Sequence, residues 1–484
     1  MRKDEVSRLS LSHPQQAKKA HFNAFMRGSG HHSAAWKHPD SNPKEDLDLD
    51  YYAKIAQIAE RGLFDSLFMA DNYSGLGRRL EPFTLLSALA ALTKHVGFIA
   101  TVSTTYNDPY HVARKFASLD HISKGRAAWN IVTGHSKEDA ENLSRLEHPD
   151  VAKRYEIGDE FVEVTKQLWD SWEEDALIYD RDTGIALDSS KVYEIKFQGQ
   201  YYNVKGPLNI PRPPQGYPVL VQAGSSENGK ELAAKTAEVI FTAQQTLGAA
   251  QEFYSDVKGR LSRYGRTPDQ LLIMPGLSPI VADTEAEARD IEDEFNALLN
   301  PKQALKRLSN YFTVDLTEYS LDSLVPVDKA KPYGTITTGI TSRQEVVVDA
   351  AKRDNMTIRQ FLARSAAAHG HVSFTGSVIQ TADFIEKWIR NNGADGFNIL
   401  PHIYYTGLET FVDKVVPELQ NRGLFRTAYE GTTLRENLGL ARPENKNRAI
   451  WALRRELEQE QQKQQEQQKE RQQDQQQEQQ QKAQ

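Results

Sequence analysis

The stretch VLVQAGSSENGKELAAK, residues 219–235, decides how this chain is expected to fold. It begins as an apolar strand, turns at Ala223-Gly224, and becomes helical in pattern after Ser225 and Ser226. The helix dipole and the unpaired N–H groups of the first helical turn favour an anion at such a corner. A phosphate site after a late strand is typical of a (β/α)₈ barrel with a phosphorylated cofactor. An ordinary serine N-cap is the alternative explanation of the same residues.

Short apolar strands alternate with amphipathic helices on both sides of this stretch, as in parallel βαβ units. The helix expected over Tyr51–Arg61, for example, ends at Gly62 as its C-cap. The expected strands are His21–Met26, Ser66–Ala70, Gly97–Val102, Ala127–Val132, Val219–Gly224, Val239–Ala243, Leu271–Leu277 and Gly396–Pro401. Eight strands close a barrel without an exposed parallel edge. We therefore predict an α/β fold, a (β/α)₈ TIM barrel with insertions at its mouth.

The chain divides into a barrel and two tails. An N-terminal extension over 1–18 precedes the barrel over 19–442. The barrel contains two expected insertions, a hairpin-bearing one at about 173–218 and a partly helical, strand-poor one at about 300–375 that can serve as a lid. The Gln-rich tail over 443–484 cannot bury apolar surface, so it is expected to be helical or disordered and solvated. Self-association of the tail through its amide side chains is the alternative.

Composition narrows the function classes. The 484 residues include no cysteine, which excludes disulfides, cysteine metal ligands and thiol nucleophiles. A formal net charge of −7 does not favour binding to nucleic acid. Neither a membrane-spanning apolar run nor an apolar leader is found, so a cytoplasmic protein is expected.

Hydroxyl and amide groups dominate the predicted carboxyl ends of the strands, where barrel enzymes have their active sites. Facing carboxylates and converging hard-metal ligands do not occur there, which argues against glycoside hydrolysis and hard-metal hydrolysis. Neither a G-x-G-x-x-G nor a Walker loop is present, so an internal NAD-binding domain is not expected.

Histidines are the remaining candidates for chemistry. His31, His32 and His38 follow the first strand, where a zinc site, loop hydrogen bonding and substrate contact are alternative roles. His135 directly follows a strand end and is the best candidate for acid–base work or for a contact beside a bound cofactor. A structural role is the alternative for His135, and no metal site is predicted.

An ordered set of motifs resembles the flavin-dependent monooxygenases of the bacterial-luciferase-like superfamily. The similarity is to the branch of nitrilotriacetate and dibenzothiophene-sulfone monooxygenases and pristinamycin synthase subunits, and a bacillar subgroup that oxidises S-modified cysteines is also similar. The resemblance runs from about His21 to Leu440. It is carried by AAWKHPD, AERGLFDSLFMAD, STTYNDPYHVARKFASLDHISKGRAAWNIVT, RYEIGDEF, LWDSWEEDA, KGPLNIPRPPQG, QAGSSENG and GTTLRENLGL.

The resemblance implies a TIM barrel, reduced FMN as a diffusible co-substrate with O₂, and a separate NAD(P)H:FMN reductase. It also implies a homodimer or homotetramer. The implied cofactor-binding residues are Asp71, Thr101, Ser103, Asn130 and Thr133 around the flavin ring, and Tyr155, Ser225 and Ser226 at the phosphate.

Three positions depart from the family's usual pattern. The histidine usually found four positions before Tyr155 is Val151 here, and His148, three residues earlier, is the candidate for the same cofactor-binding role. Asn72 follows Asp71 where glycine is usual, and Gly134-His135 follows Thr133 where relatives commonly read Val-Thr-Ser. These differences lie near the expected flavin or substrate.

The resulting hypothesis is a two-component monooxygenase that uses reduced FMN and O₂ on a small S- or N-substituted substrate, with carbon–sulfur or carbon–nitrogen cleavage. Arg27, Lys37, Arg78 and Arg79 can recognise carboxylates of such a substrate. A deazaflavin-dependent dehydrogenase on the same barrel is the alternative, followed by a metal-dependent hydrolase. A non-enzymatic barrel assembled through its tail is the third alternative.

Overall fold

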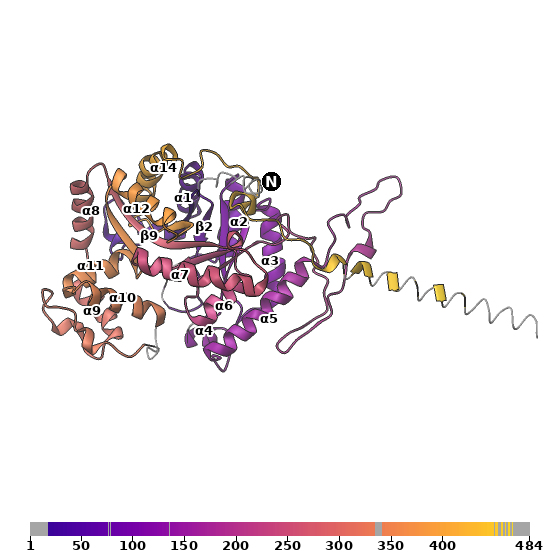
Figure 1. Ribbon diagram of the computed structural model, residues 1–484, viewed down its shortest axis with the longest axis horizontal. Coiled ribbons are helices and arrows are strands. Elements are labelled where there is room, and N and C mark those ends of the chain that lie inside the picture. Colours follow the sequence, from indigo (N-terminus) through magenta and orange to yellow (C-terminus); the bar gives the residue numbers. More distant parts are fainter. Residues whose placement is uncertain are drawn as a thin grey trace, which may run out of the picture.

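The computed structural model describes residues 18–75, 77, 79–134, 136–333 and 341–449, and beyond them 451–453, 456, 457, 460, 463, 464 and 467. A closed parallel barrel forms its centre, with helices around it (Figure 1). The barrel strands are β1 (His21–Met26), β2 (Ser66–Met69), β3 (Gly97–Ser103), β4 (Ala127–Val132), β7 (Val219–Gln222), β8 (Val239–Thr242), β9 (Leu272–Ala282) and β11 (Gly396–Ile399).

These eight strands pair in ring order, and each pairing is parallel. The ring closes where β8 pairs with β9 and β11 pairs with β1, for example His21 with Gly396. The predicted α/β barrel is therefore confirmed, and each of its strands overlaps the segment expected from the sequence. Both faces of these strands are buried, because helices cover the outside of the barrel and side chains fill its inside.

Helices follow most strands. They are α1 (Leu49–Arg61), α2 (Pro82–Leu92), α3 (Pro109–Ile122), α4 (Lys137–Asn142), α5 (Val151–Trp169), α6 (Glu227–Thr236), α7 (Leu247–Arg260), α8 (Glu285–Ala297), α9 (Pro301–Leu308), α10 (Thr341–Arg353), α11 (Ile358–Ala368), α12 (Val378–Arg390), α13 (Thr406–Thr410), α14 (Val416–Asn421) and α15 (Leu434–Asn437). No helix of the described residues is long and apolar enough to cross a membrane.

The end of α1 shows why a glycine stands at position 62. Gly62 caps the helix as expected, but the left-handed conformation belongs to the next residue, Leu63, with φ of 57°. A Cβ on Gly62 would lie 2.5 Å from a methyl carbon of Val412. Close packing rather than backbone conformation therefore explains this glycine.

A ninth strand, β10 (Val372–Ser377), was not expected from the sequence. It pairs with the second half of β9, from Leu277 to Ala282, and β9 is correspondingly longer than the predicted Leu271–Leu277. The extension leaves the barrel and carries β10 outside the closed ring. The end of the segment predicted to be strand-poor is therefore a strand.

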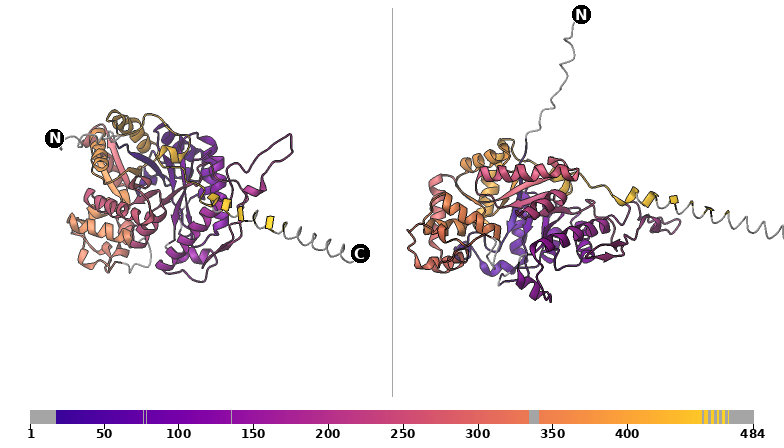
Figure 2. Two further views of the ribbon diagram at one scale, coloured as in Figure 1. Left: turned by 45° about the vertical axis from the view of Figure 1, so that its right-hand side comes forward. Right: turned by 60° about the horizontal axis from the view of Figure 1, so that its bottom comes forward.

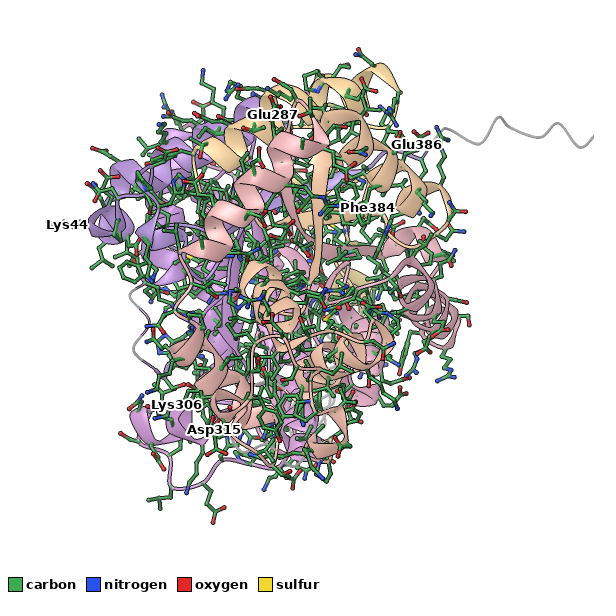
Figure 3. All side chains as sticks on the ribbon, turned by 90° about the vertical axis from the view of Figure 1, so that its left-hand side faces the viewer. Lys44, Glu287, Lys306, Asp315, Phe384 and Glu386 are labelled. Atoms are coloured by element: carbon green, nitrogen blue, oxygen red, sulfur yellow. The ribbon has the colours of Figure 1, made fainter. Side chains whose placement is uncertain are left out.

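The second insertion forms a helical layer beside the barrel. Helices α9, α10 and α11 share a hydrophobic cluster of their own, which includes Leu316, Ile358 and Phe361. Figure 3 views this side of the molecule, where Lys306 and Asp315 are exposed on the insertion and Glu287 is exposed on α8. Helices therefore occur in this segment among the described residues, and the bounds of the insertion stay a prediction.

The first insertion lies on the other side of the barrel and projects as an arm over 173–192 (Figures 1 and 2). Its expected hairpin is formed by β5 (Phe197–Gln198) and β6 (Asn203–Val204), which are antiparallel. The chain after the barrel returns to the base of this arm. Trp451 is buried and stacks on Tyr193, with 4.3 Å between the ring centroids.

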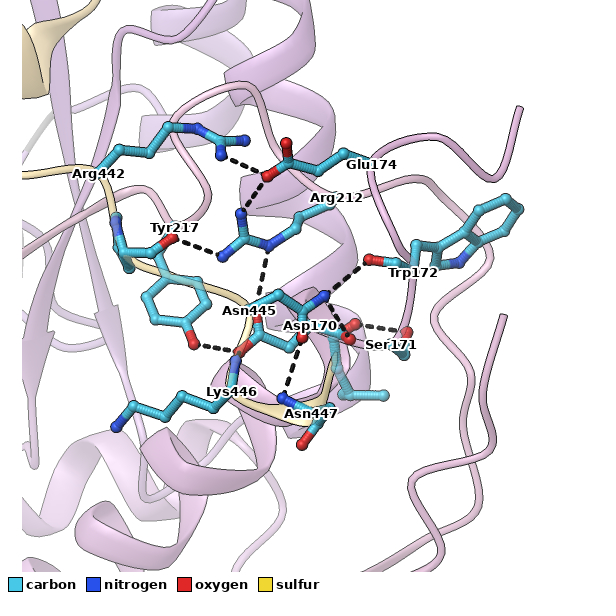
Figure 4. Close-up of polar contacts among 12 residues, drawn as sticks. Asp170, Ser171, Trp172, Glu174, Arg212, Tyr217, Arg442, Asn445, Lys446 and Asn447 are labelled. Carbon is cyan, nitrogen blue, oxygen red and sulfur yellow. Dashed lines mark hydrogen bonds and ion pairs between the residues drawn. The ribbon is translucent and has the colours of Figure 1, made fainter. Parts of the chain in front are cut away.

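A buried ion pair fixes this return (Figure 4). Arg212 Nε donates to Asp170 at 3.0 Å, and the side chains of both residues are 2% exposed. The same guanidinium donates to Glu174 and to the carbonyl oxygen of Pro443, both at 2.9 Å. Asn445 donates to the carbonyl oxygen of Asp170. Most of the Gln-rich segment lies outside the described residues, so its predicted state stays a prediction.

Replacing Arg212 by Leu should lower the free energy of unfolding by about 3–5 kcal/mol, because Asp170 would remain buried without its cation. Arg442 also pairs with Glu174, but both side chains are about half exposed. Arg442→Leu is therefore the matched control and should cost less than about 1 kcal/mol. Urea unfolding followed by circular dichroism measures both, and equal losses would contradict the assignment.

Candidate active site

A cavity of about 1020 Å³ opens at the carboxyl ends of the barrel strands. Residues that end β1, β2, β3, β4, β7 and β8 line it, together with residues of α7, α10 and the segment before β10. Barrel enzymes have their active sites at this end because the strand–helix loops converge there. Asp71, Thr101, Asn130 and Ser225, four of the residues selected from the sequence, line this one cavity.

Thr101 and Asn130 are direct neighbours across β3 and β4. Asn130 Nδ2 donates to Thr101 Oγ1 at 2.9 Å. Asn130 Oδ1 is buried and has no hydrogen-bond partner among the described residues. An unpaired buried amide oxygen costs free energy, so this wall of the cavity suits a ligand that carries an N–H donor.

Asp71 follows β2 and is partly buried beside Arg79. Burial raises the pKa of its carboxyl to about 6, while a backbone hydrogen bond from Asn72 and the charge of Arg79 oppose the shift. Asp71 can therefore exchange a proton near neutral pH, which is uncommon for a carboxyl group.

The corner after β7 contains a serine N-cap, which was the alternative explanation of this stretch, and an anion site at the corner stays a prediction. Ser226 is the N-cap of α6, and its hydroxyl accepts from Gly229 N at 3.2 Å. The Tyr155 hydroxyl lies 3.4 Å from the Ser226 hydroxyl, so a residue of α5 reaches the same corner. A Cβ on Gly224 would lie 2.4 Å from Gln222 Nε2 and 2.9 Å from the Tyr155 hydroxyl. Glycine at position 224 thus lets the Gln222 and Tyr155 side chains pack against the start of α6.

Gly229 is a part of this corner that sequence reasoning missed. A Cβ there would lie 2.9 Å from the carbonyl carbon of Gly224. The two glycines face each other and allow the first turn of α6 to approach the end of β7. Their spacing in AGSSENG was the available signal.

Five other described residues selected from the sequence for cofactor binding do not line the cavity: Ser103, Thr133, His148, Tyr155 and Ser226. Ser103 Oγ accepts from Thr105 N at 3.2 Å, and the carbonyl oxygen of Thr133 accepts from the Thr105 hydroxyl at 2.7 Å. Both residues therefore hold the loop after β3.

His148 lies between two other side chains. Its Nδ1 contacts the Tyr106 hydroxyl, and Arg154 Nη1 donates to its Nε2 at 2.8 Å. Val151, at the position where relatives often have histidine, is 51% exposed. His148 thus supports the start of α5, the helix that carries Tyr155. His135 lies outside the described residues, as does Arg78.

The loop histidines show no metal geometry. Burial lowers the pKa of both His32 and His402 to about 4. These rings and His38 pack around Phe295, and His38 stacks on it at 4.7 Å. The described residues contain no group of three His, Cys, Asp or Glu side chains that could hold a metal ion.

An apolar wall is the largest feature that the sequence did not reveal. Phe25, Phe68 and Phe241 pack edge to face, with centroids 5.0–5.3 Å apart, and each lines the cavity. Met26 and Met69 add two thioether side chains to the cavity lining. A search for polar strand ends passes over such residues. His369 and His371, which precede the unexpected strand β10, also line the cavity.

Two of the four proposed carboxylate-binding cations reach the cavity. Arg27 and Arg79 line it. Lys37 instead donates to the carbonyl oxygen of Leu298 at 2.8 Å. Cations therefore border the part of the cavity formed after β1 and β2.

Asp71→Asn should stabilise the protein at pH 7.5, since the wild-type carboxylate is charged there in a partly desolvated site. The pKa of the Asp71 carboxyl is about 6 in the folded protein and 3.8 in the unfolded chain. Its contribution to stability is therefore complete below pH 3.8 and is lost as the pH rises through about 6. The advantage of the variant should be on the order of 1 kcal/mol at pH 7.5, allowing for solvent screening, and should vanish near pH 4. Urea unfolding at both pH values measures it, with the exposed Asp182→Asn as the control. A pH-independent difference would contradict the prediction.

Comparison with known proteins places this cavity in a family. A family model described as luciferase-like monooxygenase matches residues 27–321. N-acetyl-S-(2-succino)cysteine monooxygenase of Bacillus subtilis (strain 168) is 48% identical over 437 residues, which are 89% of this chain and 98% of the relative. Nitrilotriacetate monooxygenase component A of Aminobacter aminovorans is 45% identical over 448 residues, 88% of this chain and 98% of the relative.

Among solved structures, a riboflavin lyase with modified FMN and riboflavin is similar at a TM-score of 0.77 and 30% identity. The similarity covers 90% of this chain and 99% of that chain. Fold, matched length and identity agree with the resemblance seen in the sequence motifs. The chain belongs to the luciferase-like monooxygenase family and is an enzyme of that flavin-dependent class.

Proposed function

We propose that this protein is the oxygenase of a two-component system that uses reduced FMN and O₂ to cleave a small, carboxylated, S-substituted substrate. The observation that carries the proposal is the combination in one cavity of Ser225 at the start of α6, an unpaired amide oxygen of Asn130 and two arginines. Carbon–nitrogen cleavage of an N-substituted substrate is the second form of the same chemistry.

FMN fits the residues present. A cavity of about 1020 Å³ is at the upper end of the range for ligand sites, enough for a flavin and a small substrate together. Asn130 Oδ1 can accept from a ring N–H, and Asp71 and Thr101 offer further polar contacts beside it. Ser225, Ser226 and Tyr155 would hold the phosphate at the start of α6, where the helix dipole favours it. Ser103, Thr133 and His148 would support these residues from behind.

When bound, reduced FMN supplies two electrons and activates O₂ for transfer of one oxygen atom. The residues of the chain do the rest. The aromatic wall of Phe25, Phe68 and Phe241 keeps water from the reacting atoms. Asp71 can hold or release a proton at its carboxyl near pH 6. A proton-transfer role for His135 stays a prediction.

The substrate class rests on charge and on the relatives. Arg27 and Arg79 can orient carboxylates by charge-assisted hydrogen bonds, while the apolar wall suits a thioether carbon. The two relatives described above act, by their names, on a carboxylated thioether and a carboxylated amine. Hydroxylation of the carbon beside sulfur consumes one O₂ and two electrons and releases one water. The hydroxylated carbon then expels the thiol and becomes a carbonyl.

A separate reductase is the partner that such an enzyme needs. The relative from Aminobacter aminovorans is named component A, which implies a second component. We expect an NAD(P)H:FMN reductase to deliver the reduced flavin by diffusion. A homodimer or homotetramer, a cytoplasmic location, and the domain boundaries with a solvated tail after Arg442 stay predictions.

The deciding experiment measures O₂ uptake and ¹⁸O incorporation with enzymatically reduced FMN and catalase. The substrates are N-acetylcysteine thioethers, including N-acetyl-S-(2-succino)cysteine, and nitrilotriacetate, each with and without this protein. Substrate-dependent thiol or amine release with ¹⁸O in the carbonyl product supports the proposal. Failure to bind FMN would favour the deazaflavin-dependent dehydrogenase, and activity that depends on added zinc would favour a hydrolase.

Ser225→Ala and Tyr155→Phe should each weaken FMN binding about 10-fold, since each loses a hydrogen bond to a charged group. Fluorescence quenching of oxidised FMN measures this without turnover. Ser262→Ala, in the turn after α7, is the control and should leave the Kd unchanged. An unchanged Kd for FMN in both Ser225→Ala and Tyr155→Phe would exclude phosphate binding at this corner.

Arg27→Met and Arg79→Met should each raise KM for the dicarboxylate thioether about 10-fold or more, with kcat changed less, if they orient substrate carboxylates. Lys37→Met is the control, because it removes a cation that does not line the cavity, and it should leave KM unchanged. A similar KM in all three variants would exclude these arginines from substrate recognition.

A further inference from the structure

The cavity has one half that contains the proposed cofactor-binding residues and a second half across the barrel from them. The proposed cofactor-binding residues lie on or just after β2, β3, β4 and β7, which are consecutive around the barrel. Across the ring, Phe25 of β1, Phe241 of β8 and Leu400 after β11 contribute aromatic and aliphatic side chains to the cavity. A substrate next to the flavin must therefore meet the second half.

His371 is the part of this second half that arrives from outside the barrel. The chain leaves α11 through left-handed His369 and Gly370, and His371 lines the cavity directly before β10 begins. The His371 ring lies parallel to the Phe241 ring, with centroids 4.8 Å apart and planes within 9°. It is 4% exposed, so close packing fixes its position.

Gly276 of β9 provides the space behind this ring. A Cβ at position 276 would lie 2.5 Å from His371 Nδ1 and 2.7 Å from His371 Cγ. Such distances are well inside van der Waals contact, so no side chain fits while the ring stays where it is. Gly276 lies in an extended strand, opposite Asn398 of β11, so space rather than backbone conformation explains the glycine.

We propose that Gly276 is a specificity-determining position: by leaving room for the His371 ring against β9, it sets how large a substrate group the cavity accepts. The inference deepens the proposed function and rests on it for the substrate. A methyl group at 276 would move the ring by about 1 Å away from β9. Because Phe241 already occupies one face of the ring, this movement reduces the cavity.

Three variants test this role: Gly276→Ala, His371→Ala, and the double variant Gly276→Ala/His371→Ala. The substrates are N-acetylcysteine with S-methyl, S-propyl and S-benzyl groups. Gly276→Ala should raise KM about 10-fold for the S-benzyl compound and less than about 2-fold for the S-methyl compound. His371→Ala should lower the ratio of the KM for the S-benzyl compound to the KM for the S-methyl compound. The double variant should recover the wild-type KM for the S-benzyl compound at least in part. The Kd of oxidised FMN should stay within about 2-fold throughout.

A crystal structure of Gly276→Ala provides a readout that needs no substrate, and the His371 ring should be displaced toward the cavity. Gly259→Ala, on α7 with no neighbouring atom within 4 Å of its added Cβ, is the matched control. An unmoved ring, or KM values that rise equally for all three thioethers, would overturn the inference. Wild-type protein that turns over none of the substrates would count against the proposed function instead, while the ring position still decides the role of Gly276.

Discussion

The backbone hydrogen bonds of β9 are the interaction on which the rest of the structure depends. A parallel strand inside a barrel must find a partner on each side, since an unpaired edge leaves buried N–H and C=O groups without water. β9 meets this requirement with three partners in succession: β8 over its first residues, β11 at Gly276 and Leu277, and β10 from Leu277 onward. This one strand closes the ring and returns the second insertion to the cavity. It also contains the glycine against which His371 packs.

The arrangement of polar groups in the other half of the cavity depends on the close approach of α6 to β7. Gly224 and Gly229 bring the start of α6 against the end of β7, and Tyr155 reaches the same place from α5. The N-terminus of α6, whose dipole favours an anion, therefore lies beside Ser225, which lines the cavity. The neighbouring strands contribute neutral groups, and Asp71 is the carboxyl whose protonation changes near neutrality. The other carboxyl groups that line the cavity, Glu252, Asp256 and Glu345, come from α7 and α10 rather than from the barrel strands.

Sequence reasoning predicted the barrel well because its strands are short apolar runs that alternate with helices of amphipathic pattern. It missed β10 because VSFTGS is polar, only partly buried, and pairs outside the ring. The same rule about polar strand ends selected Asp71, Thr101, Asn130 and Ser225 correctly as neighbours in space. It could not select Phe25, Phe241 or Gly276, since an apolar residue or a glycine in a strand usually serves packing alone. His371 was hidden for a topological reason, because its segment follows an insertion of unknown path.

The methionines that line the cavity affect how long one enzyme molecule remains active. The chain has no cysteine and five methionines, and two of these, Met26 and Met69, line the cavity. Under the proposed function they are oxidisable groups beside the place where O₂ is activated, and any hydrogen peroxide lost from unproductive cycles forms next to them. Oxidation to the sulfoxide would turn two apolar wall residues into polar ones. The number of turnovers before inactivation thus becomes a measure of how completely oxygen transfer is coupled to substrate.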